Sequence, residues 1–280
     1  MSTLVNKNYK NKIHKLELVL KNLSETVRVT GNKTLFDTIE DLISRIHDPF
    51  MFVIVGEVKV GKSSFINALL DTGEEICKAA PNPMTDIIQQ ITYGEKSEEI
   101  VVNEFLKKRL EPVEILKEVA IVDTPGTNTI VKNHQEITER FIPVSDLVVF
   151  VFEAKNPYRQ SAWEFLDYIN EEWRRKVLFV LQQKDLMNEN DLLTNINGVR
   201  EMAISKSITE PHIFAVSALM ELNGSSQDSG YIPLRKWIED NITGGNAPLL
   251  KLQNMFVTSK EINDNLTQSL VLRKKQLEID

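Results

Sequence analysis

The stretch that decides the fold is VIVGEVKVGKSS, residues 53–64. An apolar run ends at Gly56, four residues follow, and then comes Gly61-Lys62-Ser63, which is the spacing of a phosphate-binding loop. In such a loop backbone N–H groups turn toward phosphate oxygens, and the following helix directs its positive end at the same anion. Lys62 is expected to reach the terminal phosphates and Ser63 to ligate Mg²⁺. The predicted nucleotide-binding residues of the loop are Gly56, Glu57, Val58, Lys59, Val60, Gly61, Lys62, Ser63 and Ser64.

From residue 50 onward, short apolar runs alternate with longer helical patterns. Continuous apolar runs such as VAIV and LVVFVF suit strands of a parallel sheet that is buried on both faces. We therefore predict a doubly wound α/β domain with a mostly parallel sheet. The predicted strands are 50–55, 87–93, 100–104, 119–122, 146–152, 177–181 and 212–216, and the predicted helices are 62–70, 134–141, 160–169, 191–206 and 232–240. The strands at 87–93 and 100–104 are expected to form an antiparallel hairpin at one edge.

Amphipathic helices are predicted on both sides of this domain. Residues 10–47 read as two helices separated by Gly31-Asn32. After the break at 243–246, one long helix carries an apolar stripe made of Leu249, Leu252, Phe256, Ile262, Leu266 and Leu270. We expect these helices to form one bundle beside the α/β domain, although they could instead cap the sheet. The predicted boundaries are 1–48 for the N-terminal helices, 49–243 for the α/β domain and 244–280 for the C-terminal helix.

Bulk properties exclude several classes of protein. The 280 residues carry a formal net charge of −7 and no basic stripe, which argues against a nucleic-acid partner. Cys77 is the single cysteine, so no disulfide can form within the chain, and the four histidines are scattered. No apolar run approaches the roughly 20 residues needed to cross a bilayer. We therefore expect a cytoplasmic protein.

A second motif, Asp123-Thr124-Pro125-Gly126, follows the predicted strand VAIV. A carboxylate at a strand tip suits Mg²⁺ binding through water, and the backbone N–H of Gly126 allows the loop to close on a γ-phosphate. Thr85, in the proline-rich segment PNPMT, could complete the Mg²⁺ shell, or it could be an ordinary loop threonine. The predicted metal ligands are Ser63, Thr85 and Asp123, and the predicted catalytic residues are Lys59, Lys62, Ser63, Thr85 and Gly126.

The base is expected to be guanine. Asp185, at the end of Gln182-Gln183-Lys184-Asp185, is placed to accept hydrogen bonds from guanine N1 and N2, which adenine does not offer. Gln182 and Gln183 stand where Asn or Thr and then Lys are usual, so we expect guanine selectivity with looser binding. Ser217-Ala218 ends the last predicted strand, and its backbone is expected to contact the guanine carbonyl. The predicted base-binding residues are Gln183, Lys184, Asp185, Ser217 and Ala218.

Taken in order, these motifs resemble those of the dynamin superfamily of GTPases, and within it the bacterial dynamin-like proteins and the mitofusins. The segments GEVKVGKSSFINALL, PNPMTDIIQQITYG and VDTPGTN…HQEITERFIPVSDLVVFVFEA carry the resemblance, over about residues 50–240. It implies a P-loop GTPase domain flanked by a neck bundle, Mg²⁺-dependent hydrolysis of GTP to GDP and phosphate, dimerisation across the nucleotide face, and membrane remodelling. Family members carry a further stalk and membrane-binding tip, so we expect this chain to be a shortened piece of a longer bacterial protein rather than an unusually small member.

The chain departs from the family at the positions that handle the attacking water. Dynamins carry a Gln-Ser pair where Val58 and Lys59 stand, and Thr127 takes the place of the water-orienting glutamine of other GTPases. Guanylate-binding proteins have an arginine at the place of Lys59 and use it as a finger within the same molecule. By this resemblance Lys59 would stabilise charge on the phosphates, less strongly because an ammonium makes no bidentate fork. The alternative is a solvent-facing lysine that pairs with Glu57 or contacts a partner subunit.

Three functions follow as alternatives. The first is a GTP-hydrolysing enzyme stimulated by pairing, and the second is a GTP-binding interaction module that pairs with little hydrolysis. A translation- or ribosome-associated GTPase is the third, and the acidic balance argues against it. The expected partners are a guanine nucleotide, a second copy or a related dynamin-like protein, and membrane lipids through regions absent from this chain, with a peripheral membrane location for the full-length protein.

Overall fold

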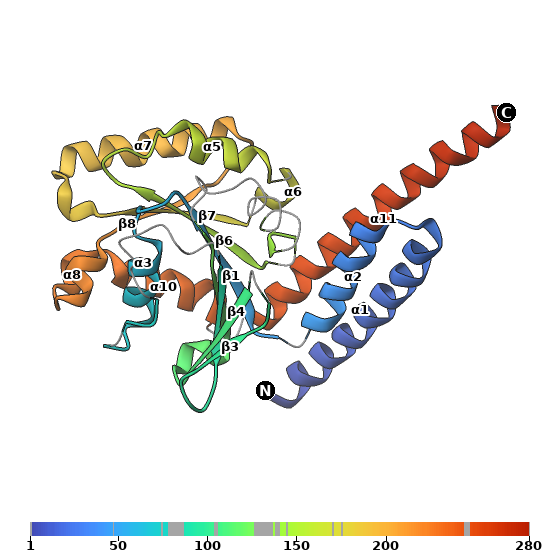
Figure 1. The fold of residues 1–280 in the computed structure, drawn as a ribbon, viewed down its shortest axis with the longest axis horizontal. Coiled ribbons are helices and arrows are strands. Elements are labelled where there is room, and N and C mark those ends of the chain that lie inside the picture. The colour runs from blue at the N-terminus through green and yellow to red at the C-terminus, as the bar shows by residue number, and fades with distance from the viewer. Residues whose placement is uncertain are drawn as a thin grey trace. The chain divides into compact units, whose positions relative to one another are not determined.

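Figure 1 shows the computed structural model of the chain. It describes residues 2–46, 48–73, 75–77, 87–103, 106–125, 137, 141–143, 145–169, 171–174, 176–243 and 247–279. The chain divides into two compact units, one made of Met1–Asp48 with Asn246–Asp280 and the other of Pro49–Gly245. Thr85, Gly126 and Thr127 lie outside the described residues, as does most of the predicted helix 134–141.

The larger unit is built on one sheet with the strand order β3-β4-β2-β5-β1-β6-β7-β8. The strands are β1 (Phe50–Gly56), β2 (Ile88–Tyr93), β3 (Glu98–Val101), β4 (Leu106–Glu111), β5 (Val119–Asp123), β6 (Leu147–Glu153), β7 (Val177–Gln182) and β8 (His212–Val216). β1 pairs in parallel with β5 and β6, and β7 and β8 continue the parallel run. The predicted α/β fold with a mostly parallel sheet is confirmed. Because neighbouring parallel strands end at one edge, the carboxyl ends of β5, β1, β6, β7 and β8 lie in a row.

The predicted hairpin between residues 87–93 and 100–104 is wrong. β2 runs antiparallel to β5 and parallel to β4, whereas β3 forms an antiparallel hairpin with β4. β4 has no counterpart among the predicted strands, because the three consecutive basic residues of LKKRLE are typical of a loop. In the sheet two of these basic side chains form ion pairs with acidic residues. Lys107 pairs with Glu99 at 2.8 Å, and Arg109 pairs with Glu111 at 2.5 Å.

Helices cover both faces of this sheet. They are α3 (Lys62–Leu70), η1 (Glu114–Lys117), α5 (Gln160–Asp167), α6 (Glu171–Arg174), η3 (Lys184–Leu186), α7 (Glu189–Ser205), α8 (Ala218–Leu222), α9 (Ser226–Ser229), α10 (Tyr231–Ile238) and η4 (Glu239–Thr243). α5 and α7 lie on one face, and α3 and α10 on the other (Figure 1). Trp163 on α5 stacks on Phe152 of β6 with ring centroids 5.2 Å apart, and Phe65 on α3 lies 5.9 Å from Tyr231 on α10. These aromatic contacts fix the helices that flank the phosphate loop.

The smaller unit contains α1 (Ser2–Thr30), α2 (Lys33–Arg45) and α11 (Ala247–Ile279), which pack against one another. The predicted break at Gly31-Asn32 is confirmed, and the Asn32 side chain caps α2 by accepting a hydrogen bond from the N–H of Leu35 at 3.1 Å. Ser24 on α1 donates to Glu40 on α2 at 2.6 Å. Within the described residues, none of the helices has the length and apolarity needed to span a bilayer.

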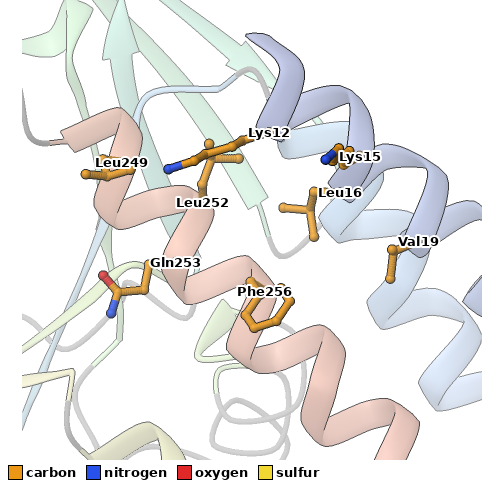
Figure 2. A pocket seen from close by; sticks show the side chains of 8 residues that line it. All are labelled: Lys12, Lys15, Leu16, Val19, Leu249, Leu252, Gln253 and Phe256. Carbon is orange, nitrogen blue, oxygen red and sulfur yellow. The ribbon is translucent and has the colours of Figure 1, made fainter. Parts of the chain in front are cut away.

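The predicted apolar stripe of α11 is wrong at three of its six positions. Leu249, Phe256 and Leu270 expose 50%, 59% and 43% of their surface, whereas Met255, which was outside the stripe, is buried. Leu249 and Phe256 line a groove of about 440 Å³ between α1 and α11, with Leu16 on the α1 side (Figure 2). The helix therefore presents a different face to its partners than the simple three- and four-residue spacing suggests.

Candidate active site

The phosphate loop connects β1 to α3, and its backbone conformation favours glycine at positions 56 and 61. Gly56 has a φ of +152°, and a Cβ there would lie 2.3 Å from the carbonyl oxygen of Val151 on the neighbouring strand β6. Gly61 has a φ of +91° and is the N-cap residue of α3. The loop is therefore held between the crowded edge of β6 and the start of α3, where free backbone N–H groups favour an anion.

Lys62 bridges the phosphate loop. Its Nζ donates hydrogen bonds to the carbonyl oxygens of Gly56 at 3.1 Å and Glu57 at 2.9 Å. Burial lowers the pKa of the Lys62 ammonium, and the carboxylates of Asp123 and Glu57 oppose this effect in part. Because a bound phosphate would also favour the charged ammonium, the site has an electrostatic preference for an anionic ligand.

Ser63 and Asp123 form the candidate cation site. The Ser63 hydroxyl donates to Oδ2 of Asp123 at 3.3 Å, while Oδ1 is buried and finds no hydrogen-bond partner among the described residues. Burial raises the pKa of Asp123, and Lys62 and Ser63 oppose this effect. Thr124 donates to the carbonyl oxygen of Ile54 at 2.7 Å, which fixes the end of β5 beside β1. A buried carboxylate oxygen without a donor, next to a hydroxyl, fits the oxygen ligands that Mg²⁺ prefers.

The side chain of Glu57 is engaged by another part of the chain. It is only 2% exposed, and its carboxylate accepts hydrogen bonds from Arg159 Nη1 at 3.1 Å and from the hydroxyl of Ser161. Both partners lie at the start of α5. The alternative in which Lys59 pairs with Glu57 is therefore wrong, and Glu57 contributes to the loop through its backbone.

Lys59 lies at the exposed part of the loop. Its φ is +67°, a left-handed conformation that is uncommon for a residue with a side chain, and the side chain is exposed. The neighbouring Val60 is buried in the core and thereby anchors the loop. An exposed ammonium at this position suits a contact with a bound nucleotide and a contact with a partner subunit equally well, so the role of Lys59 stays a prediction.

Gln182 links the phosphate loop to the loops predicted to bind the base. Its Oε1 accepts hydrogen bonds from the backbone N–H of Gln183 at 3.2 Å and of Ala218 at 3.1 Å. Its Cγ would lie 3.1 Å from a Cβ at Gly61. The side chain is 2% exposed. A glutamine at this motif position is thus long enough to reach the next strand end and to occupy the N–H of Ala218.

The other predicted base-binding residues follow two adjacent strand ends. Gln182 and Val216 are register partners at the ends of β7 and β8. The segments that carry Asp185 and Ala218 therefore leave the sheet from adjacent strand ends. Asp185 lies in η3 and is exposed. Ser217 is fully buried, and its hydroxyl accepts a hydrogen bond from the N–H of Met220, so its side chain caps α8. The backbone of Ser217 is also engaged, because its N–H donates to the carbonyl oxygen of Ser229 at 2.8 Å and its carbonyl oxygen accepts from the N–H of Glu221 at 3.1 Å.

The predicted roles of Thr85 and Gly126 rest on the sequence, because both lie outside the described residues. The structure does show what holds Cys77, the last described residue of the segment that directly follows α3. The side-chain amide of Asn67 on α3 donates to the carbonyl oxygen of Cys77 and accepts from its N–H, both at 2.8 Å. This pair of buried hydrogen bonds ties the segment after α3 to the phosphate-loop helix.

Two residues of this region, Asn67 and Arg159, carry no role in the sequence-based prediction. Gln182 was placed at the first position of the guanine motif, but its contact with the N–H of Ala218 was not predicted. Asn67 and Arg159 gave no local signal, because Asn67 contacts a residue 10 positions away and Arg159 one that is 102 positions away. Such pairs depend on how the chain folds and not on spacing within a motif.

Comparison with known proteins agrees with this site. A family model described as 50S ribosome-binding GTPase matches residues 51–183. Over 58% of its length the chain is 38% identical to the probable transmembrane GTPase FZO-like, chloroplastic, of Arabidopsis thaliana, and it covers 18% of that protein. It is also 31% identical to the tRNA modification GTPase MnmE of Thermotoga maritima, over 60% of this chain and 31% of that protein.

The fold is shared with bacterial dynamins. A solved structure of an oligomerised bacterial dynamin pair superposes on 100% of this chain and 59% of that chain, with a TM-score of 0.62 and 17% sequence identity. The chain is therefore similar to bacterial dynamins in fold and to several GTPases in sequence. The sequence matches agree with the predicted GTPase domain, and the shared fold agrees with the predicted resemblance to dynamins. The chain spans only 18% of one of its first curated relatives and 59% of another.

Proposed function

We propose that this dynamin-like domain hydrolyses GTP to GDP and phosphate with Mg²⁺, and that pairing of two domains across the nucleotide face accelerates the reaction. In the full-length protein, located in the cytoplasm and peripheral at a membrane, the cycle would drive membrane remodelling. The observation that carries the proposal is the cluster of Lys62, Ser63 and Asp123, in which a buried carboxylate oxygen has no donor among the described residues.

Each group of the cluster has a task in phosphoryl transfer. Mg²⁺ held by Ser63 and Asp123 would neutralise charge on the phosphate oxygens. The Lys62 ammonium and the loop N–H groups would hold the terminal phosphates and stabilise the charge that develops on them. Water adds to the γ-phosphorus in line with the bond that breaks, GDP leaves with the bridging oxygen, and the proton of the water is released with phosphate. Lys59 would add positive charge at the same phosphates.

Exposed leucines around the base-binding loops support pairing at this face. Leu186 follows Asp185 in η3, and Leu219 follows Ala218 in α8; each is 62% exposed. Leu222, one turn further along α8, is 51% exposed. A group of large apolar side chains beside a nucleotide site is typical of a surface that associates. A second copy or a related dynamin-like protein would bury these leucines, and lipids would be bound by regions outside this chain.

Turnover measured against protein concentration tests the proposal. A rate per molecule that rises with concentration, together with a dimer that forms with GDP and aluminium fluoride but not with GDP alone, is the expected result. Leu219→Glu should abolish both the concentration dependence and the dimer. Ile204→Glu, at a similarly exposed position at the far end of α7, is the matched control and should change neither.

A GTP-binding interaction module is the second candidate. Val58 and Lys59 occupy the positions of the dynamin Gln-Ser pair, which favours weak hydrolysis. This candidate predicts tight nucleotide binding with a flat, near-zero rate at every protein concentration. A measured rate that climbs with concentration would exclude it.

A further inference from the structure

The phosphate loop contains a fully buried carboxylate, which is an unusual group to place beside a polyphosphate. Glu57 immediately follows Gly56, the first glycine of the loop, and is 2% exposed. A buried anion repels a nearby phosphate unless another group neutralises it. The guanidinium of Arg159 does so through a hydrogen-bonded ion pair at 3.1 Å.

This ion pair is connected to Lys62 through a single residue. The carboxylate of Glu57 binds Arg159, while the carbonyl oxygen of the same residue accepts a hydrogen bond from Lys62 Nζ at 2.9 Å. Ser161 donates to the other carboxylate oxygen. The side chain of Glu57 is therefore fixed at both oxygens, and this fixes the peptide that positions the ammonium of Lys62.

Arg159 itself stands on a well-anchored loop between β6 and α5. Ala154 donates its N–H to the carbonyl oxygen of Gln182 at 2.8 Å, and the same residue accepts from the side chain of Asn195 at 2.7 Å. Trp163 donates to the carbonyl oxygen of Pro157 at 2.8 Å. The loop thus connects Glu57, in the phosphate loop, to Gln182, which holds the base-binding loops.

We propose that Arg159 is a positioning residue of the nucleotide site, which acts through the buried carboxylate of Glu57 to hold the phosphate loop in its binding shape. It neutralises an anion that would otherwise repel the phosphates, and it does so from a loop braced against the base-binding end. Its side chain is 45% exposed, so a molecule that contacts this loop could alter nucleotide affinity through the same pair. The inference concerns nucleotide binding and rests on the proposed function only for its effect on turnover.

Dissociation of a fluorescent GDP from purified variants tests this role without requiring hydrolysis. Arg159→Ala should accelerate dissociation by about tenfold or more, because it leaves the buried Glu57 carboxylate without its cation. Glu57→Gln removes the charge but keeps a hydrogen-bond acceptor for Ser161, so it should accelerate dissociation less than Arg159→Ala does. The double variant should return to within about threefold of Glu57→Gln, because no uncompensated anion is left. Rescue of one variant by a second substitution is a result that a general loss of stability would not give.

Two controls separate this effect from ordinary destabilisation. Glu153→Gln removes the other acidic partner of Arg159, bound at 3.1 Å, and should leave GDP dissociation unchanged. Arg174→Ala removes a guanidinium that bonds the carbonyl oxygens of Ile169 and Lys206 away from the site, so it should lower the melting temperature without changing dissociation. If Arg159→Ala does not fold, Arg159→Gln with and without Glu57→Gln gives the same comparison, because glutamine also lacks the positive charge.

The outcomes are distinct from those for the proposed function. Equal GDP dissociation from the wild type, Arg159→Ala and Arg174→Ala would overturn the positioning role. Additive effects of Arg159→Ala and Glu57→Gln would also overturn it, because the two residues would then act independently. A wild type that binds GDP but never hydrolyses GTP would remove the proposed hydrolysis and leave the dissociation test intact.

Discussion

The hydroxyl of Ser63 lies 3.3 Å from Oδ2 of Asp123, although 60 positions separate the two residues in the sequence. Ser63 is the second residue of α3 and Asp123 ends β5, so the contact exists only because β1 and β5 are parallel neighbours. The second carboxylate oxygen, Oδ1, is buried without a donor among the described residues. We expect a divalent cation to bind Ser63 and Asp123 and so to connect the phosphate loop with the motif that begins at Asp123.

Asp123→Asn tests the cation site with nearly unchanged volume. The amide removes the negative charge that attracts Mg²⁺, so the Mg²⁺ dependence of nucleotide binding should weaken by about tenfold or more. The measurement is GDP dissociation with and without EDTA. EDTA should accelerate dissociation from the wild type and have little effect on the variant. An equal response of both proteins would contradict the assignment of Asp123.

Lys59 is expected to act on turnover rather than on binding. Lys59→Ala should lower kcat far more than it weakens GTP affinity, because charge on the phosphates grows in the transition state. Lys59→Arg should retain turnover or raise it, since a guanidinium can donate two parallel hydrogen bonds. Steady-state rates and GTP titrations check both variants at protein concentrations high enough for dimers to form. Lys236→Ala, at an exposed lysine on α10, is the control. Unchanged turnover of Lys59→Ala in protein that still dimerises would rule out the finger.

Asp185 should determine the preference for guanine over hypoxanthine. Inosine diphosphate lacks the 2-amino donor of GDP, so the wild type should bind it roughly tenfold more weakly through one lost charged hydrogen bond. Asp185→Ala should weaken GDP binding and remove the difference between the two nucleotides. Competition against fluorescent GDP measures both affinities. Asp191→Ala, at another exposed aspartate nearby in the sequence, should keep the preference; a variant of Asp185 that also keeps it would place base selection elsewhere.

Cys77 offers a direct measure of how firmly the chain after α3 is held at this residue. The thiol is buried, and burial raises its pKa well above the ordinary value, with a further contribution from Asp123. Since the thiolate is the reactive form, labelling of the native protein should stay slow as the pH rises through about 8.5, while labelling of the unfolded chain accelerates. Fast native labelling in that range would contradict the burial of this thiol.

Asn67→Ala should expose the same thiol. The substitution removes two buried hydrogen bonds to the backbone of Cys77, each worth about 1 kcal/mol, so labelling should accelerate roughly tenfold or more. Reaction with a thiol reagent followed by mass spectrometry measures the rate. Asn223→Ala, at an exposed asparagine after α8, is the control. An unchanged rate for Asn67→Ala would mean that the two bonds do not hold this segment.

Local patterns were sufficient for the parts of this protein that are built from neighbours in the sequence. The glycine spacing of the phosphate loop and the continuous apolar strands predicted β1, α3 and the parallel sheet, because backbone geometry and burial on both faces restrict the residues allowed there. The break between α1 and α2 was equally visible, since Asn32 caps the helix that follows it. β4 was missed because its basic side chains are paired with acidic residues on β3 and at its own end, and such pairing leaves no local trace.

The sequence by itself determined that a nucleotide loop, a candidate Mg²⁺ ligand and a guanine motif follow one another in the order of a GTPase. Only the tertiary structure decided which side chains complete the site. It directed Glu57 to Arg159, placed Gln182 on the N–H of Ala218, and left one oxygen of Asp123 without a donor among the described residues. The physical reason is that these contacts join strand ends and loops that meet only when the parallel sheet has formed. Spacing along the chain predicts a motif, but the partners of a buried charge depend on which residues the folded chain places next to it.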